Sequence, residues 1–240
     1  ERTTVNRLVP GSIPGRGVMP QIENATWSEP KTPRISKLTS MIVQYDGMID
    51  LETIDMWRNA LHKVFDGKVP RDGKAHNRNN HGFRIENYLH EPLALQLNHQ
   101  VKDAGFKMLS RYARDCPIIS YSMWYELGVA AAYYYRTYDK GDDYQWHVDK
   151  AKDPTTDLKV SILIYLNDDF EGGNTMFLNE RLRVEPKKGR ILMFPCGPHF
   201  IHKSSEILSG KKDVIWNCFS QNRLELRPPA GINKSRENDH

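Results

Sequence analysis

A histidine and an aspartate two residues apart, His147 and Asp149, have the residue types and the spacing of a metal site. In an extended strand, side chains at positions i and i+2 leave the same face, so this imidazole and this carboxylate point the same way. Two histidines and one carboxylate on one face form the facial triad of non-haem Fe(II) sites, which leaves metal positions open for a co-substrate and O2. The pair supplies two of the three ligands, and a second histidine must come from elsewhere in the chain.

Two later histidines, His199 and His202, are candidates for the third ligand. A lysine, Lys212, follows ten residues after His202, with Gly210 between them, whereas the tenth residue after His199 is a serine. A hairpin that turns near Gly210 would bring Lys212 back into the interior beside the metal. A buried cation there suits the distal carboxylate of a dicarboxylate co-substrate, because a desolvated carboxylate needs an opposite charge. We therefore favour His202 over His199, and expect Lys211 to face the other way.

The elements that must position these residues begin with a strand and two helices. A strand is expected over residues 41–45, and Asp50 can cap a helix that continues to Phe65. A second helix is expected over about residues 91–114, and the polar segment 66–84 between the helices is expected to be a loop. The apolar side of the second helix is expected to carry Leu95, Val101, Phe106 and Leu109.

From about residue 117 the pattern changes to short runs of β-branched and aromatic residues separated by Gly, Asn, Asp and Pro. Short strands at this spacing, following two helices, predict a double-stranded β-helix, or jelly roll, with the helices packed outside one sheet. The expected strands cover residues 129–138, 159–167, 175–178, 181–186, 189–195 and 213–219.

Length and composition limit the classes of protein that fit. With 240 residues and 39% hydrophobic residues, the chain can bury one sizeable core. It contains no apolar run of the roughly 20 residues that a membrane span needs, so we expect no membrane partner. A net charge of +4 gives no reason to expect nucleic acid. Three cysteines without CxxC spacing favour a reducing compartment, and we expect a cytoplasmic protein.

The expected domain organisation has three parts. Residues 1–37, rich in Pro and Gly, are expected to form a flexible basic arm, and residues 223–240 a polar tail. Residues 38–222 are expected to form a single domain whose catalytic jelly-roll core covers about 120–220. The sequence does not indicate an oligomeric state.

The chemistry-bearing residues, in their order along the chain, resemble the Fe(II)/2-oxoglutarate-dependent dioxygenases. Between the metal ligands, the sequence is similar to the prolyl 4-hydroxylase branch, where a strand ending Tyr-Leu-x-x is followed by Gly-Gly-x-Thr-x-Phe. The matching segments are Tyr165-Leu-Asn-Asp168, Gly172-Gly-Asn-Thr-Met-Phe177 and, upstream, Tyr138-x-x-Gly141-x-x-Tyr144. The resemblance covers roughly residues 120–220.

The resemblance implies a role for each matching residue. The residues that would bind Fe(II) are His147, Asp149 and His202. Those that would contact 2-oxoglutarate are Lys212, which would pair with its distal carboxylate, and the hydroxyl-bearing Tyr138, Tyr165 and Ser161. For the three hydroxyl residues, ordinary packing in the core is the alternative.

The resemblance also implies a reaction. It predicts hydroxylation of prolyl residues in a peptide or protein with O2, releasing succinate and CO2, with ascorbate as a candidate reductant. The carboxylate of Asp149 favours hydroxylation over halogenation, since halogenating relatives have a small residue there. Three alternatives stay open: another amino acid or small molecule as substrate, a nucleic-acid base, and a non-enzymatic jelly-roll binding module. Relatives that act on bases carry further arginines after the distal histidine, whereas the basic residues within 203–222 are all lysines.

Overall fold

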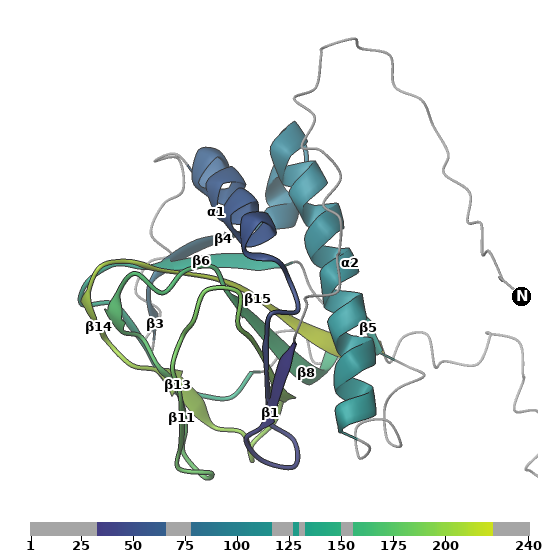
Figure 1. Cartoon of the computed structure of the whole chain (residues 1–240), viewed down its shortest axis with the longest axis vertical. Coiled ribbons are helices and arrows are strands. Elements are labelled where there is room, and N and C mark those ends of the chain that lie inside the picture. The colour runs from purple at the N-terminus through teal and green to yellow at the C-terminus, as the bar shows by residue number, and fades with distance from the viewer. Residues whose placement is uncertain (1–32, 66–77, 117–126, 130–132, 150–155, 223–240) are drawn as a thin grey trace, which may run out of the picture.

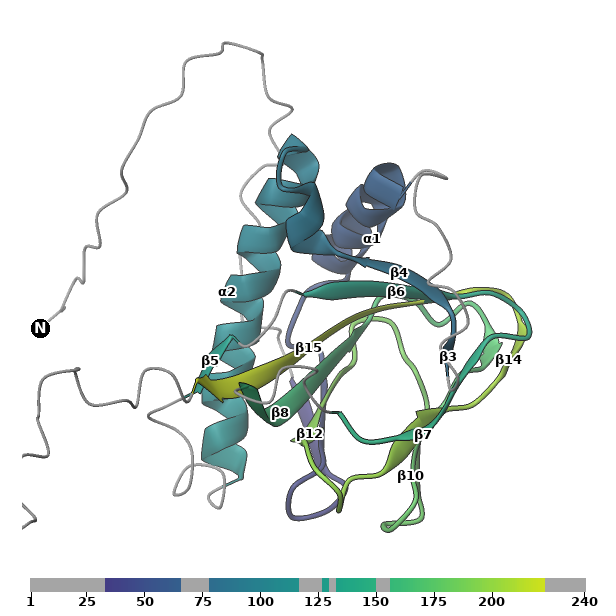
Figure 2. The same ribbon diagram turned by 180° about the vertical axis from the view of Figure 1, so that it is seen from behind.

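The computed structural model describes residues 33–65, 78–116, 127–129, 133–149 and 156–222. These residues form two main antiparallel sheets and one separate pair of strands, with two α-helices on the outer side of the larger sheet (Figure 1). Seen from behind, the helices again lie on one side of the larger sheet, and β7 and β10 of the smaller sheet lie on the opposite side (Figure 2). The fold is therefore the predicted mainly β jelly roll with its helices packed on one sheet.

The larger sheet has the strand order β1-β2-β12-β8-β15-β6-β4, and β5 also pairs with β15. Neighbouring strands are antiparallel. The strands are β1 (Arg34–Lys37), β2 (Val43–Asp46), β4 (His81–Arg84), β5 (Leu127–Val129), β6 (Tyr134–Tyr138), β8 (Thr156–Tyr165), β12 (Ile191–Pro195) and β15 (Lys212–Asn222).

The smaller sheet has the order β11-β10-β13-β7-β3, and a separate pair is formed by β14 and β9. Its members and this pair are β3 (Arg78–Asn79), β7 (Asp143–His147), β9 (Glu171–Gly172), β10 (Thr175–Phe177), β11 (Leu182–Val184), β13 (His202–Ser204) and β14 (Ile207–Ser209).

The first helix, α1 (Leu51–Phe65), begins where the sequence predicts. The Asp50 carboxylate caps it by accepting from the backbone N–H of Thr53 at 2.7 Å. A short 3-10 helix, η1 (Ile85–Tyr88), precedes the second helix, α2 (Pro92–Asp115). No helix in the described part of the chain is long and apolar enough to cross a membrane.

The buried face of α2 differs from the prediction. Val101 and Leu109 are buried as expected, but Leu95 and Phe106 are exposed. The helix instead packs against the sheet through buried residues that recur every three or four positions, among them Leu97, Val101, Ala104 and Met108. The longest apolar side chains in this helix therefore do not all mark its buried face.

Strand alternation divides the buried residues into two cores, one on each face of the larger sheet. Along β8, Ile162 and Ile164 belong to the core under the helices, whereas Tyr165 belongs to the core between the sheets. The same alternation places Met193 of β12 towards the helices and Phe194 towards the second sheet. The core between the sheets is the one that contains the predicted site.

Three expectations about local structure are corrected. The last four residues of the expected arm, Arg34–Lys37, form β1 because they pair with β2 along their whole length. The expected loop 66–84 contains β3 and β4, which pair with β7 and β6. The chain does turn at Gly210, with φ +77°, but β14 and β15 pair with different strands and form no hairpin. Residues 1–32, 66–77 and 223–240 lie outside the described residues.

Candidate metal centre

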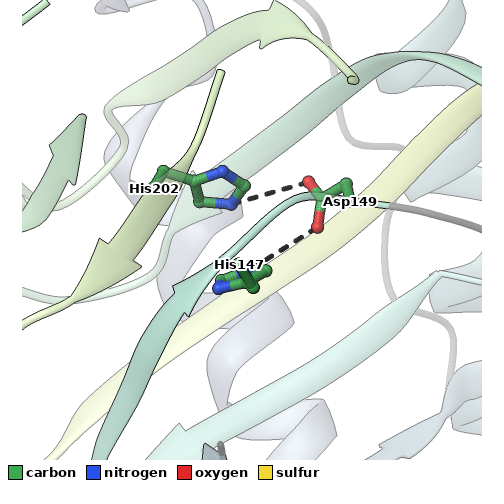
Figure 3. Close-up of side chains that lie close together, drawn as sticks. All are labelled: His147, Asp149 and His202. Carbon is green, nitrogen blue, oxygen red and sulfur yellow. Dashed lines mark ion pairs between the residues drawn. The ribbon is translucent and has the colours of Figure 1, made fainter. Parts of the chain in front are cut away.

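The two histidines of the predicted triad are neighbours across two paired strands. His147 ends β7, His202 begins β13, and the two residues are register partners in the smaller sheet. Their ring centroids are 4.2 Å apart. Pairing of strands distant in sequence therefore brings together the imidazoles, which both point towards Asp149 (Figure 3).

Asp149 completes the cluster from two residues beyond β7. Its Oδ1 lies 3.7 Å from Nε2 of His147, and its Oδ2 lies 3.7 Å from Nε2 of His202. All three side chains are less than a tenth exposed. Imidazole and carboxylate ligands bond to a divalent ion such as zinc at about 2.0–2.2 Å, so one ion placed between these atoms can reach all three. The predicted ligand set is thus assembled in space.

The second nitrogen of each imidazole is hydrogen-bonded to the backbone. Nδ1 of His147 lies 2.7 Å from the carbonyl oxygen of Gln145, and Nδ1 of His202 lies 2.9 Å from that of Phe200. A carbonyl oxygen only accepts, so each Nδ1 carries the proton and each Nε2 keeps a lone pair. Both Nε2 atoms face Asp149, which is the tautomer and orientation that metal binding requires.

Neighbouring side chains hold the ligands in place. The ring of Tyr144 stacks on His147 with centroids 3.5 Å apart, and Phe194 packs edge-on against His202. The hydroxyl of Ser161, fully buried on β8, donates to Oδ2 of Asp149. We expected this hydroxyl to contact the co-substrate, but in the structure it supports a ligand carboxylate.

His199, the alternative third ligand, lies outside the cluster. Its side chain is exposed, and its backbone carbonyl accepts from Nδ2 of Asn179 at 2.7 Å. The described histidine and carboxylate groups that meet at this position are those of His147, Asp149 and His202. The structure therefore places His202, and not His199, beside His147 and Asp149, and its role as a metal ligand stays a prediction.

Lys212 lies in the core between the sheets, as its spacing from His202 predicts. The side chain is 3% exposed, and Nζ donates to the Gly173 carbonyl at 2.6 Å and to Oγ of Ser204 at 2.9 Å. Lys211, next to it, is exposed and pairs with Asp139 at 3.1 Å. Alternation along the chain thus separates the two lysines as expected.

The ammonium group of Lys212 has no carboxylate partner among the described residues. Burial lowers the pKa of Lys212 to about 7, because a charged amine loses its hydration in the core. A carboxylate ligand placed here would restore the charged form. The residue is therefore equipped to receive an anion from outside the chain.

The two predicted tyrosines surround Lys212. Nζ lies 5.1 Å from the ring centroid of Tyr138 and 5.5 Å from that of Tyr165. Tyr165 is fully buried, its hydroxyl is 2.7 Å from Oγ1 of Thr175, and burial raises the pKa of its phenol. Both tyrosines are thus placed at the lysine, and their contact with a co-substrate stays a prediction.

Two contributors to the site were missed from the sequence. Ser204 lies two residues after His202 on β13, so the same i, i+2 rule that links His147 to Asp149 indicates that it faces inwards. Gly173 adopts φ +62°, and a Cβ there would lie 3.0 Å from Cδ of Lys212. The second glycine of the Gly-Gly pair therefore gives Lys212 the space to reach the Gly173 carbonyl.

Comparison with known proteins gives this geometry a context. The family model of the 2OG-Fe(II) oxygenase superfamily matches residues 132–219. A protein of Acanthamoeba polyphaga mimivirus named "Putative prolyl 4-hydroxylase" is 33% identical over 67 residues. That match covers 24% of this chain and 28% of the viral protein, so the chain spans little more than a quarter of the relative's length.

Solved structures with the same fold include three prolyl hydroxylases. A viral collagen prolyl hydroxylase from Paramecium Bursaria Chlorella virus-1, solved with 2OG, aligns over 75% of this chain and 96% of its own, with 19% identity and a TM-score of 0.56. A Pseudomonas putida prolyl-4-hydroxylase aligns over 77% of this chain and 95% of its own, with 16% identity and a TM-score of 0.55. A Trichoplax adhaerens prolyl hydroxylase was solved in complex with a peptide of a hypoxia inducible factor. It aligns over 79% of this chain and 87% of its own, with 14% identity and a TM-score of 0.62.

Proposed function

We propose that the chain is a 2OG-Fe(II) oxygenase of the prolyl 4-hydroxylase type, which hydroxylates prolyl residues in a peptide or protein; the family match, the named relative and the shared fold support this. The co-substrates are 2-oxoglutarate and O2, the products are succinate and CO2, and ascorbate is the proposed reductant. A cytoplasmic location is also proposed, supported by three cysteines that are all free thiols.

The position of Lys212 is the observation that carries the proposal. Its Nζ bonds to Ser204, which lies two residues from the proposed iron ligand His202 on the same strand. The β13 strand thus carries both a candidate metal ligand, His202, and a hydroxyl that bonds to the cation of Lys212. A dicarboxylate that chelates the metal at one end and meets Lys212 at the other end satisfies both groups at once.

Each residue of the site has a task that follows from its contacts. Bound Fe(II) with 2-oxoglutarate supplies the activation of O2 and the insertion of one oxygen atom into a C–H bond. His147, Asp149 and His202 hold the ion, and the protonated Nδ1 atoms keep the imidazoles turned towards it. Lys212 neutralises and orients the far carboxylate of the co-substrate. Apolar rings beside His202, including Phe194, help to exclude water.

The assignment of prolyl residues as the substrate is supported by the relatives. The mimivirus relative is named a prolyl 4-hydroxylase, and the Trichoplax structure holds a peptide.

The test measures succinate formed from 2-oxoglutarate by the full chain with Fe(II), with and without a set of proline-containing peptides. We expect succinate formation that increases with peptide, and one oxygen atom added at proline. His202→Ala should abolish turnover, whereas the matched variant His199→Ala should retain it, since His199 lies outside the cluster.

The possible failures are separable. Oxygen added at a different residue or to a non-peptide compound would contradict the prolyl assignment and leave the oxygenase proposal standing. Undiminished succinate formation in His202→Ala, or no succinate with any substrate, would contradict the oxygenase proposal itself.

A further inference from the structure

Next to Asp149, the larger sheet places a pair of thiols. Cys218 on β15 is the register partner of Ser161 on β8, and Cys196 directly follows β12 on the other side of β8. The two sulfur atoms are 3.7 Å apart, and Oγ of Ser161 lies 3.3 Å from the Cys196 sulfur and 3.0 Å from the Cys218 sulfur. Three adjacent strands thus direct two thiols and one hydroxyl towards the carboxylate of Asp149.

The spacing of the two sulfurs distinguishes between two kinds of chemistry. A disulfide needs the sulfurs at about 2.0 Å, so the free thiols are well outside bonding distance. Two thiolates on one tetrahedral ion, with metal–sulfur bonds of about 2.3 Å, lie about 3.8 Å apart. The observed separation, 3.7 Å, is that of two thiols in contact, and one ion could bond to both sulfurs without moving them apart.

We propose that Cys196, Cys218 and Asp149 form a second metal site, which takes a thiophilic divalent cation such as Zn²⁺ or Co²⁺. The ligand atoms of these three residues lie within 4.8 Å of one another. Ser161 offers a hydroxyl oxygen as the fourth donor. Two sulfur and two oxygen donors suit an ion that is tetrahedral and accepts soft ligands, in contrast to the imidazole and carboxylate set of His147, Asp149 and His202.

An ion can reach this site from the surface side of Cys196. That residue is partly exposed at the end of β12, whereas Cys218 is fully buried. Formation of the two metal–sulfur bonds releases the two thiol protons to solvent, and the cation's charge is balanced by the two thiolates. The Asp149 carboxylate then completes the coordination.

The two metal sites share one ligand. Asp149 faces the two histidines and also accepts the hydrogen bond of Ser161 next to the thiols. A cation bound by the thiols therefore competes for the carboxylate that the proposed iron site needs. This consequence rests on the proposed function: Zn²⁺ bound by the thiols lowers the affinity for Fe(II) and so inhibits turnover.

The binding test uses Co²⁺ titrated into the metal-free full chain, because cobalt bound by thiolates shows a sulfur-to-metal charge-transfer absorption that imidazole and carboxylate ligands do not produce. We expect this band at one equivalent in the wild type and in His202→Ala, which lacks a complete histidine site. Cys196→Ala should lose the band, since it removes one of the two sulfurs at a partly exposed position. Cys116→Ala is the matched control and should keep the band.

Each outcome decides the proposal. Absence of the band in His202→Ala, or a band that persists in both Cys196→Ala and Cys218→Ala, would overturn the thiol site. Circular dichroism of each variant establishes that it is folded, and Cys196→Ala suffices if Cys218→Ala does not fold. A chain that shows the band but forms no succinate with Fe(II) would contradict the proposed function and leave the thiol site intact.

Discussion

Lys212 and Asp213 are adjacent in the sequence, and their side chains lie in different cores on opposite faces of β15. The Lys212 amine donates to Ser204 in the core between the sheets. The Asp213 carboxylate, fully buried, accepts from Arg58 of α1 at 2.8 Å on the helix side. The strand that delivers the cation to the site is thus anchored from behind by a helix.

Replacement of Lys212 tests its role in binding the co-substrate. Lys212→Ala should raise the KM for 2-oxoglutarate by about 10- to 100-fold, because a hydrogen-bonded charge pair contributes about 1.5–3 kcal/mol. Lys211→Ala should leave it unchanged, since Lys211 points to solvent and pairs with Asp139. Steady-state succinate formation measures both. An unchanged KM in Lys212→Ala would refute the assignment.

The depressed pKa of Lys212 predicts a proton uptake when the co-substrate binds. With a pKa of about 7 the buried amine is mostly neutral at pH 8, while a carboxylate partner favours the ammonium form. Binding at pH 8 should therefore take up about one proton, and affinity should fall as the pH rises above about 7.

Calorimetry at pH 8 in two buffers of different ionisation enthalpy measures this uptake in the metal-loaded protein. The control is Lys212→Arg, whose guanidinium is protonated throughout and should take up none on binding. Equal heats in the two buffers for the wild type would contradict the prediction.

Ser161→Ala separates support of a metal ligand from contact with the co-substrate. The variant removes the hydroxyl that donates to Asp149, so the affinity for Mn²⁺, a redox-stable probe of the histidine site, should fall about 10-fold. The KM for 2-oxoglutarate at saturating metal should not change. Ser110→Ala, on α2, is the control for both measurements. A raised KM with unchanged metal affinity would restore the role in co-substrate binding.

Asp213→Asn should destabilise the fold. The carboxylate also accepts from Tyr135 at 2.7 Å and lies 3.0 Å from Nε2 of His62. Its replacement by an amide therefore removes the negative charge that these groups and Arg58 contact. We expect the free energy of unfolding in urea to fall by about 3 kcal/mol. Asp169→Asn, an exposed partner of Arg58, should cost less than about 1 kcal/mol. Similar losses in the two variants would show that the buried network adds nothing.

The same carboxylate predicts a loss of stability in acid. Burial by itself would raise the pKa of Asp213, but its hydrogen bonds outweigh burial and lower the pKa to about 2. A folded-state pKa below that of the unfolded chain contributes stability that is complete above about pH 4. That contribution, about 2 kcal/mol, is lost as the pH falls from about 4 to about 2. Over this pH range, the free energy of unfolding in urea should fall more steeply with acid in the wild type than in Asp213→Asn. Equal pH dependence in the two proteins would contradict the prediction.

The elements that local geometry controls were predictable from the sequence. The alternation of side chains along a strand placed His147 and Asp149 together and separated Lys212 from its neighbour Lys211. The cap at Asp50 located the start of α1. In each case the relationship depends on a few neighbouring residues and on a fixed backbone period, so it requires no knowledge of the rest of the chain.

The sequence by itself therefore determined the types and spacing of the candidate ligands and the jelly-roll class, whereas tertiary structure decided which distant groups meet. Short strands such as β1 and β13 have too few residues to show a period, and they exist because partners far along the chain supply their hydrogen bonds. The contact of Ser161 with Asp149 and the 3.7 Å approach of Cys196 to Cys218 arise from strand order in the larger sheet. Strand order is set by the packing of both cores together, and no local segment contains that information.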